Sequence, residues 1–182
     1  LNSKDFEEEY IKEKIFNSID EANNKIYNKA RNEEKCSGMG TTVTLAYITD
    51  KSLYIGHVGD SRAYVFKNNK LTQITEDHSL VEELIKNGSI SRKEAKYHPQ
   101  RNIITRAVGT GEKIDVDVNI IPKEEIEIFL LCTDGLTNML DDDEIESFLI
   151  NSENMQIACE NLVNLSNDRG GYDNITVIAV KF

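Results

Sequence analysis

One aspartate stands where an apolar run ends, a position from which a carboxylate could bind a metal ion. The run begins at Ile126, reads as a strand buried on both faces, and is followed by Asp134 and Gly135. A buried, ionised carboxylate is costly unless a cation pairs with it, and no Lys or Arg lies within several residues of Asp134. A metal ion is one natural partner. The alternative is that Asp134 only opens a turn or caps the next element.

A second aspartate, Asp173, stands directly before the last predicted strand, Asn174–Phe182, which also reads as a buried strand. If that strand pairs antiparallel with the strand that Asp134 ends, both carboxylates lie at the same end of one sheet. Mg²⁺ and Mn²⁺ prefer oxygen ligands of this kind. A protein typically supplies two carboxylates to such an ion, and water molecules complete its coordination. A third acid, Asp60, lies in a tight turn, where a role as an ordinary turn residue is the alternative.

The elements that must position these acids follow an α+β pattern, with runs of strands and helices segregated between them. Apolar spacing predicts one long helix or two abutting helices over Lys4–Glu34, and two further helices are predicted over Asp141–Ile150 and Ser152–Ser166. Strands are predicted at Thr41–Ile48, Leu53–Val58, Arg62–Phe66, Leu71–Thr75 and Ile114–Ile121, besides the two above, the first four as an antiparallel meander. We expect residues 78–111 to form short helical pieces in a surface insertion. The length of 182 residues predicts one domain, 1–182.

Charge and cysteine content limit the classes of function. The formal net charge of −11, with no cluster of cations, argues against nucleic acid or an anionic membrane as the main partner. No apolar run approaches the roughly 20 residues of a membrane span, and no signal-peptide pattern is present. The three cysteines lack a Cys-x-x-Cys spacing, which favours a reduced, cytoplasmic location. None is followed by Arg at the spacing that a cysteine-dependent phosphatase needs.

Several short motifs together resemble one family, the type 2C metal-dependent protein serine/threonine phosphatases, in particular the compact bacterial ones. The motifs occur in the order and approximate spacing of that family. They are Gly38-Met39-Gly40-Thr41-Thr42, Val58-Gly59-Asp60-Ser61-Arg62, His98-Pro99-Gln100-Arg101-Asn102, Thr105-Arg106-Ala107-Val108-Gly109, Thr133-Asp134-Gly135-Leu136 and Asp173-Asn174-Ile175-Thr176.

This resemblance implies a four-layer α-β-β-α sandwich of two mostly antiparallel sheets, with two Mg²⁺ or Mn²⁺ ions at one end. It implies hydrolysis of phosphoserine and phosphothreonine in proteins by a metal-activated water, opposing bacterial Ser/Thr kinases. By motif match, Asp134 and Asp173 are ligands of one metal, and Asp60 and Asp134 hold a weaker third ion. Asn138, also a candidate metal ligand, stands where some relatives carry another Asp, so it can offer only a neutral oxygen to that third ion. The surface insertion at residues 78–111 corresponds to the family's flap beside the active site, and Arg101 within it could contact phosphoprotein.

The sequence also departs from the family. The family's first segment supplies the carboxylate that bridges the two metals, the phosphate-binding Arg, the general-acid His and the first strands, and it has no counterpart before Leu1. Because the chain begins at Leu1 rather than Met, we expect a processed or truncated product, inactive as given, with no catalytic residue beyond the metal ligands. Two alternatives stay open: a non-catalytic module that binds phosphoprotein or metal, and a fragment that assembles by strand swapping through exposed sheet edges.

Overall fold

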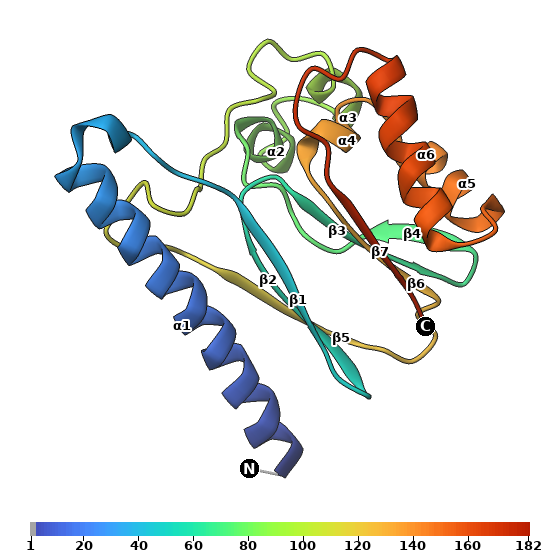
Figure 1. Ribbon diagram of the computed structural model, residues 1–182, viewed down its shortest axis with the longest axis horizontal. Helices are drawn as coiled ribbons and strands as arrows, with labels where there is room; N and C mark the ends of the chain where they lie inside the picture. The colour runs from blue at the N-terminus through green and yellow to red at the C-terminus, as the bar shows by residue number, and fades with distance from the viewer. Residues whose placement is uncertain (1–2) are drawn as a thin grey trace. The chain divides into compact units, whose positions relative to one another are not determined.

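Two antiparallel sheets organise the computed structural model, which describes residues 3–182 (Figure 1). The first sheet has the order β1-β2-β5, with β1 at Val43–Ile48, β2 at Ser52–Val58 and β5 at Asp117–Pro122. The second has the order β4-β3-β6-β7, with β3 at Arg62–Lys67, β4 at Lys70–Gln73, β6 at Ile128–Cys132 and β7 at Val177–Lys181. All neighbouring strands are antiparallel. The predicted α+β class with two antiparallel sheets is therefore confirmed.

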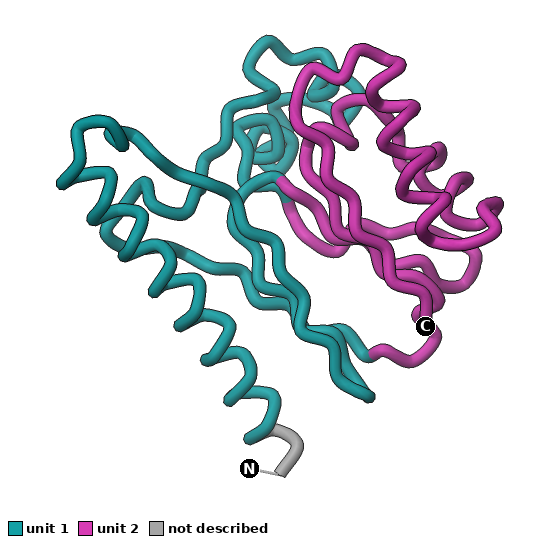
Figure 2. Tube along the Cα trace, viewed as in Figure 1, with its two compact units in different colours: residues 1–60, 77–122 teal, residues 61–76, 123–182 magenta. Residues whose placement is uncertain are grey.

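The chain divides into two units, each with its own sheet and core (Figure 2). Unit 1 runs to Asp60 and resumes over Asp77–Pro122, and unit 2 comprises Ser61–Glu76 and Lys123–Phe182. The chain thus enters unit 2, returns to unit 1 and enters unit 2 again. A single domain over 1–182 stays a prediction from length.

In unit 1, helix α1 (Ser3–Asn32) packs on the first sheet. Its apolar face buries Ile15 and Ile19 against Tyr54 and Val58. Gly56 in the middle of β2 permits the close approach, because a Cβ atom there would lie 2.5 Å from Ile15 Cγ2. A short 3-10 helix, η1 (Glu34–Cys36), follows α1.

The segment 78–111 of unit 1 carries the short helical pieces that the sequence predicts. Helix α2 spans Leu80–Lys86 and helix α3 spans Arg92–Ala95. Serine side chains cap both helices, and the α3 cap is a reciprocal capping box between Ser91 and Glu94.

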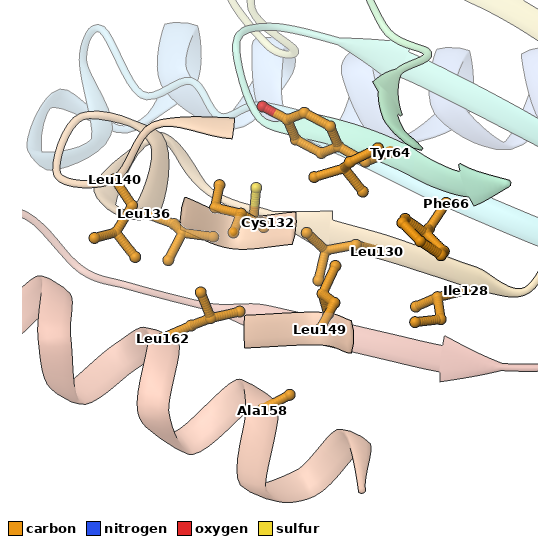
Figure 3. Close-up of a cluster of buried hydrophobic side chains, with 12 residues drawn as sticks. Tyr64, Phe66, Ile128, Leu130, Cys132, Leu136, Leu140, Leu149, Ala158 and Leu162 are labelled. Carbon is orange, nitrogen blue, oxygen red and sulfur yellow. The ribbon is translucent and has the colours of Figure 1, made fainter. Parts of the chain in front are cut away.

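In unit 2, helices α5 (Asp142–Asn151) and α6 (Met155–Asp168) pack on the second sheet, and a single-turn helix α4 (Asp134–Thr137) follows β6. Figure 3 shows the core between them, where Leu130 of β6, Leu149 of α5 and Leu162 of α6 lie within one cluster. Each of these three side chains is at most 1% exposed. The carboxyl-terminal end of β6 is therefore anchored in the packed core of unit 2.

Two details of the predicted secondary structure are wrong. The first four strands do not form one meander, because β2 pairs with β5 and β3 pairs with β6. The turn between β2 and β3 contains Gly59 at φ +117°, a backbone conformation that favours glycine, and it carries the chain from one sheet to the other. The last helix begins after Asn154, whose side chain accepts from Ile157 N, whereas the Ser152 hydroxyl binds Phe148 O at the end of α5.

The prediction that strand β7 is buried is also wrong. It is an edge strand with a half-exposed pattern, and Ile178 is 54% exposed. Composition alone does not distinguish an edge strand from a central one, because both can be rich in Val and Ile. Among helices of residues 3–182, none is long and apolar enough to cross a membrane.

Candidate metal centre

Asp134 and Asp173 lie at the same end of the second sheet, as the sequence predicts. Strands β6 and β7 are antiparallel neighbours, with Cys132 opposite Val177. The carboxyl end of β6 and the amino end of β7 therefore coincide. Asp134 comes two residues after β6, and Asp173 comes four residues before β7.

Thr133 joins the segment that follows β6 to the segment that precedes β7, just beyond the paired residues of the two strands. Its backbone N–H donates to Thr176 O (3.1 Å), and Thr176 N–H donates to its hydroxyl oxygen (3.0 Å). The same hydroxyl donates to Asn174 O (3.2 Å). Gly135 lies against the backbone of Asn174, too close for any side chain. The residues that flank Asp134 thus contact the residues that follow Asp173.

Asp134 occupies the first turn of α4, with Thr133 at the N-cap position. Its half-buried carboxylate accepts a hydrogen bond from Asn138 Nδ2 (3.2 Å), and Asn138 N–H donates to Asp134 O (2.8 Å). Asp173 is exposed, and its Oδ1 accepts from the N–H of Asn174 (2.7 Å). Three candidate ligands, Asp134, Asp173 and Asn138, therefore gather in unit 2.

The surroundings of Asp134 disfavour its ionised form. Burial, followed by the neighbouring charge of Asp173, raises the pKa of Asp134 above its ordinary value, and hydrogen bonds from Gly135 N–H and Asn138 only partly offset this. Within the described residues, neither carboxylate forms an ion pair with Lys, Arg or His. The pair is a set of oxygen donors without a cationic side-chain partner among the described residues, and this donor chemistry fits Mg²⁺ or Mn²⁺.

The donor set of these carboxylates is small. Among the side chains of residues 6–182, which the structure describes, no group of three or more His, Cys, Asp or Glu is gathered as a metal cage. Asp134 and Asp173 thus form a two-carboxylate site, which suits a cation that keeps several waters.

The two other candidate residues belong to unit 1. Asp60 is half-buried in the turn after β2. The backbone of the preceding Gly59 is held by His78, because Gly59 N–H donates to His78 Nδ1 (3.0 Å) and His78 N–H donates to Gly59 O (2.7 Å). Arg101 is exposed in the loop after α3, where its N–H donates to His98 O (3.1 Å).

Sequence reasoning did not identify Asp117 as the partner of His78 and Arg106, nor Glu144 as the partner of Arg169. His78 Nε2 lies 3.1 Å from Asp117 Oδ2, and Arg106 Nη1 donates to Asp117 Oδ1 (3.0 Å). In unit 2, the guanidinium of Arg169 binds Glu144 and the backbone of Met139. The one available signal was Glu144 at the third position after Asp141, the spacing of a capping box.

Two antiparallel sheets, with a carboxylate pair at one sheet end, define an α+β protein with an oxygen-rich site of the kind that hard cations occupy. Residues 2–84 match the family model for protein phosphatase 2C. The serine/threonine phosphatase stp of Listeria welshimeri is 42% identical over 163 residues, which cover 90% of this chain and 65% of that relative. The chain thus spans slightly less than two thirds of the length of this relative.

Solved structures agree. The serine/threonine phosphatase Stp1 from Staphylococcus aureus matches with a TM-score of 0.91 at 36% identity, covering 100% of this chain and 70% of that one. The catalytic domain of the serine/threonine protein phosphatase PstP, solved in complex with two manganese ions, matches with a TM-score of 0.78 at 31% identity, covering 87% of this chain and 66% of that one. The chain belongs to the protein phosphatase 2C family.

Proposed function

We propose that this chain carries part of the active site of a metal-dependent protein phosphatase that hydrolyses phosphoserine and phosphothreonine in proteins. The observation that carries the proposal is the pair Asp134 and Asp173, held at one sheet end with no ion pair to any cationic side chain that the structure describes, in residues 6–182. Family membership and the two manganese ions of the PstP structure support it.

Asp134 and Asp173 would bind one of two Mn²⁺ or Mg²⁺ ions, and the Asn138 amide would orient Asp134 through its hydrogen bond. Asp60, with Asp134, would contribute to a weaker third ion. When bound, the ions neutralise phosphate charge and lower the pKa of a water that attacks phosphorus while the Ser or Thr oxygen leaves. Arg101, exposed in its loop, would contact the phosphoprotein.

The proposal extends to the substrates, the cellular location and the self-association of the protein. The substrates would be phosphoproteins, including a Ser/Thr kinase whose action the enzyme opposes. None of Cys36, Cys132 and Cys159 forms a disulfide, which supports action in the reducing cytoplasm. The edge position of β7 supports self-association through a sheet edge.

We further propose that the 182-residue chain alone turns over only traces of substrate. The resemblance implies that the two-ion site of this family would use a further carboxylate, supplied by the family's first segment. The described residues bring only the pair Asp134 and Asp173 together, without a third acidic or imidazole ligand in the group. The bridging group expected from the resemblance would have to come from elsewhere.

The experiment is Mn²⁺-dependent phosphate release from a phosphothreonine peptide. It compares the 182-residue chain with a version extended upstream of Leu1 by the family's first segment, each with and without Asp134→Asn. We expect activity only in the extended chain, lost on Asp134→Asn. Comparable turnover by the short chain would contradict the trace-activity proposal. If both versions fold and neither is active, a non-catalytic binding module replaces the phosphatase.

A further inference from the structure

The segment that carries Asp173 begins with two glycines and needs external support. Arg169 is the C-cap of α6, and Gly170 and Gly171 follow at φ +127° and +52°. Their N–H groups donate to Asn167 O (3.0 Å) and Ser166 O (3.1 Å), which fixes the start of the segment to α6. Within the part of the chain whose side chains are described, residues 6–182, the only hydrogen bond of the Asp173 carboxylate is local, from Asn174 N–H.

The guanidinium of Arg169 reaches across to the connection between α4 and α5. Its Nη1 donates to Met139 O (2.9 Å) and to Glu144 Oε2 (2.8 Å), and its Nη2 donates to Glu144 Oε1 (2.5 Å). This is a forked contact with a carboxylate, which fixes direction as well as distance. Met139 closely follows the short helix that Asp134 begins, and its N–H donates to Leu136 O (3.0 Å) of that helix.

The carboxylate of Glu144 is itself held in place. Its Oε2 accepts from Asp141 N–H (3.1 Å), the reciprocal half of the capping box that begins α5. The next residue, Ile145, is 0% exposed in the core of unit 2. Arg169 therefore joins the Asp173 segment to an anchor whose own backbone is fixed by packing.

Two tethers thus flank the carboxylate pair. Thr133 ties the residue before Asp134 to the residues after Asp173, and Arg169 ties the segment before Asp173 to the residues after Asp134. We propose that Arg169, through Glu144 and Met139, is a positioning residue that sets the separation of Asp134 and Asp173 and thereby their affinity for a divalent cation. This inference deepens the proposed metal site and rests on it.

If Arg169 only stabilised the fold, its loss would mainly lower stability; if it positions the carboxylates, its loss should mainly weaken metal binding. An exposed ion pair changes stability little, and the Arg169 and Glu144 side chains are 40% and 37% exposed. Loss of a residue that orients metal ligands typically weakens metal affinity by about 10-fold or more. Arg169→Ala should therefore weaken Mn²⁺ binding about 10-fold and change the melting temperature only slightly.

The test is a Mn²⁺ titration of the 182-residue chain, followed by paramagnetic broadening of the Gly135 and Asn174 amide signals. We expect about a 10-fold weaker affinity for Arg169→Ala. Arg169→Lys should lose most of the same affinity, because an ammonium cannot make the forked contact. Glu144→Gln should also weaken binding, although Gln at the third helical position still completes a capping box.

The matched control is Arg92→Ala. Arg92 makes a similar forked contact with Glu82 in unit 1, at 3.1 and 3.3 Å, and its loss should leave Mn²⁺ affinity unchanged. Wild-type affinity in Arg169→Ala, or an equal loss in Arg92→Ala, would overturn the inference.

A second measurement separates this inference from the metal site itself. Without metal, amide hydrogen exchange at Gly171–Asn174 should be faster in Arg169→Ala than in the parent chain, and unchanged in Arg92→Ala. If the parent chain binds no Mn²⁺, the proposed metal site fails. Faster exchange would then still support Arg169 as the residue that positions the Asp173 segment, and unchanged exchange would overturn it.

Discussion

Gly135 lies so close to Asn174 that a Cβ atom added to it would be 2.3 Å from the Asn174 carbonyl oxygen. A contact that short requires one backbone segment to move, since the atom that the Cβ would meet belongs to the backbone rather than to a flexible side chain. The separation of the segments that carry Asp134 and Asp173 therefore depends on the absence of a side chain at Gly135.

Gly135→Ala should destabilise the chain by about 1–3 kcal/mol, the usual cost of overpacking a close contact, and should weaken Mn²⁺ binding. Chemical denaturation and the Mn²⁺ titration measure the two effects. Gly88→Ala is the control, because a Cβ atom added to Gly88, at φ +76°, would meet nothing within 4 Å among the described residues. Its cost is only backbone strain of about 1 kcal/mol. If Gly135→Ala bound Mn²⁺ as tightly as the parent chain, the close contact between Gly135 and Asn174 would not determine metal affinity.

Asn23 of α1 joins that helix to the end of the 78–111 segment. Its side chain is 0% exposed, accepts from Gly109 N–H (2.7 Å) and donates to Gly111 O (2.9 Å). Asn23→Ala should cost about 1–3 kcal/mol, because it leaves two backbone groups without their partner in a buried position. Urea unfolding measures the loss.

The control for that prediction is the next residue in the chain. The Asn24 side chain donates to Asp20 within the same helix, and Asn24→Ala should change stability by no more than about 0.5 kcal/mol. Equal effects at the two positions would show that helix propensity, rather than the contact with residues 109–111, determines the result.

Local patterns were sufficient to predict the parts of the site that lie next to each other in sequence. The apolar run before Asp134 and the run after Asp173 were each predicted as a strand, whereas their pairing was stated only as a condition, which the observed β6–β7 pairing fulfils. Helix α1 followed from its apolar spacing because one face of it packs on a sheet.

Features that depend on distant pairing were not predictable. Nothing near Gly59 in the sequence states that β2 pairs with β5 and β3 with β6, since hydrogen-bonding partners are chosen by the whole sheet. The contact between Arg169 and Glu144 spans 25 residues and unites a helix end with a helix start. Charged residues at such separation carry no periodic signal that would pair them.

The carboxyl group of Asp117 should contribute stability that depends on pH. Burial alone would raise its pKa, but the hydrogen bond and charge of His78, followed by Arg106, outweigh burial and lower the pKa of Asp117. A lowered pKa means that the folded state favours the ionised form. The contribution is therefore present above the unfolded pKa of about 3.9 and is lost as pH falls through the lower, folded value.

Asp117→Asn should accordingly reduce stability at pH 7 by roughly 0.5–1 kcal/mol, a modest amount because the side chain is 39% exposed. The difference from the parent chain should shrink as pH falls below about 3.9. Melting curves from pH 7 into this acidic range test this, with exposed Asp115→Asn as the control. A difference that stayed constant over the whole range would mean that ionisation of Asp117 is not its source.

Asp134→Asn should affect the chain in opposite ways with and without metal. Without metal, the neutral amide removes a half-buried charge that lies beside Asp173, so the melting temperature should rise slightly. With Mn²⁺ at about 100 times its Kd, the parent chain should gain roughly 2.7 kcal/mol, and the variant should gain much less. Asp143→Asn, at an exposed position in the first turn of α5, should respond to Mn²⁺ like the parent chain. Equal Mn²⁺ stabilisation of the Asp134→Asn variant would locate metal binding away from this carboxylate pair.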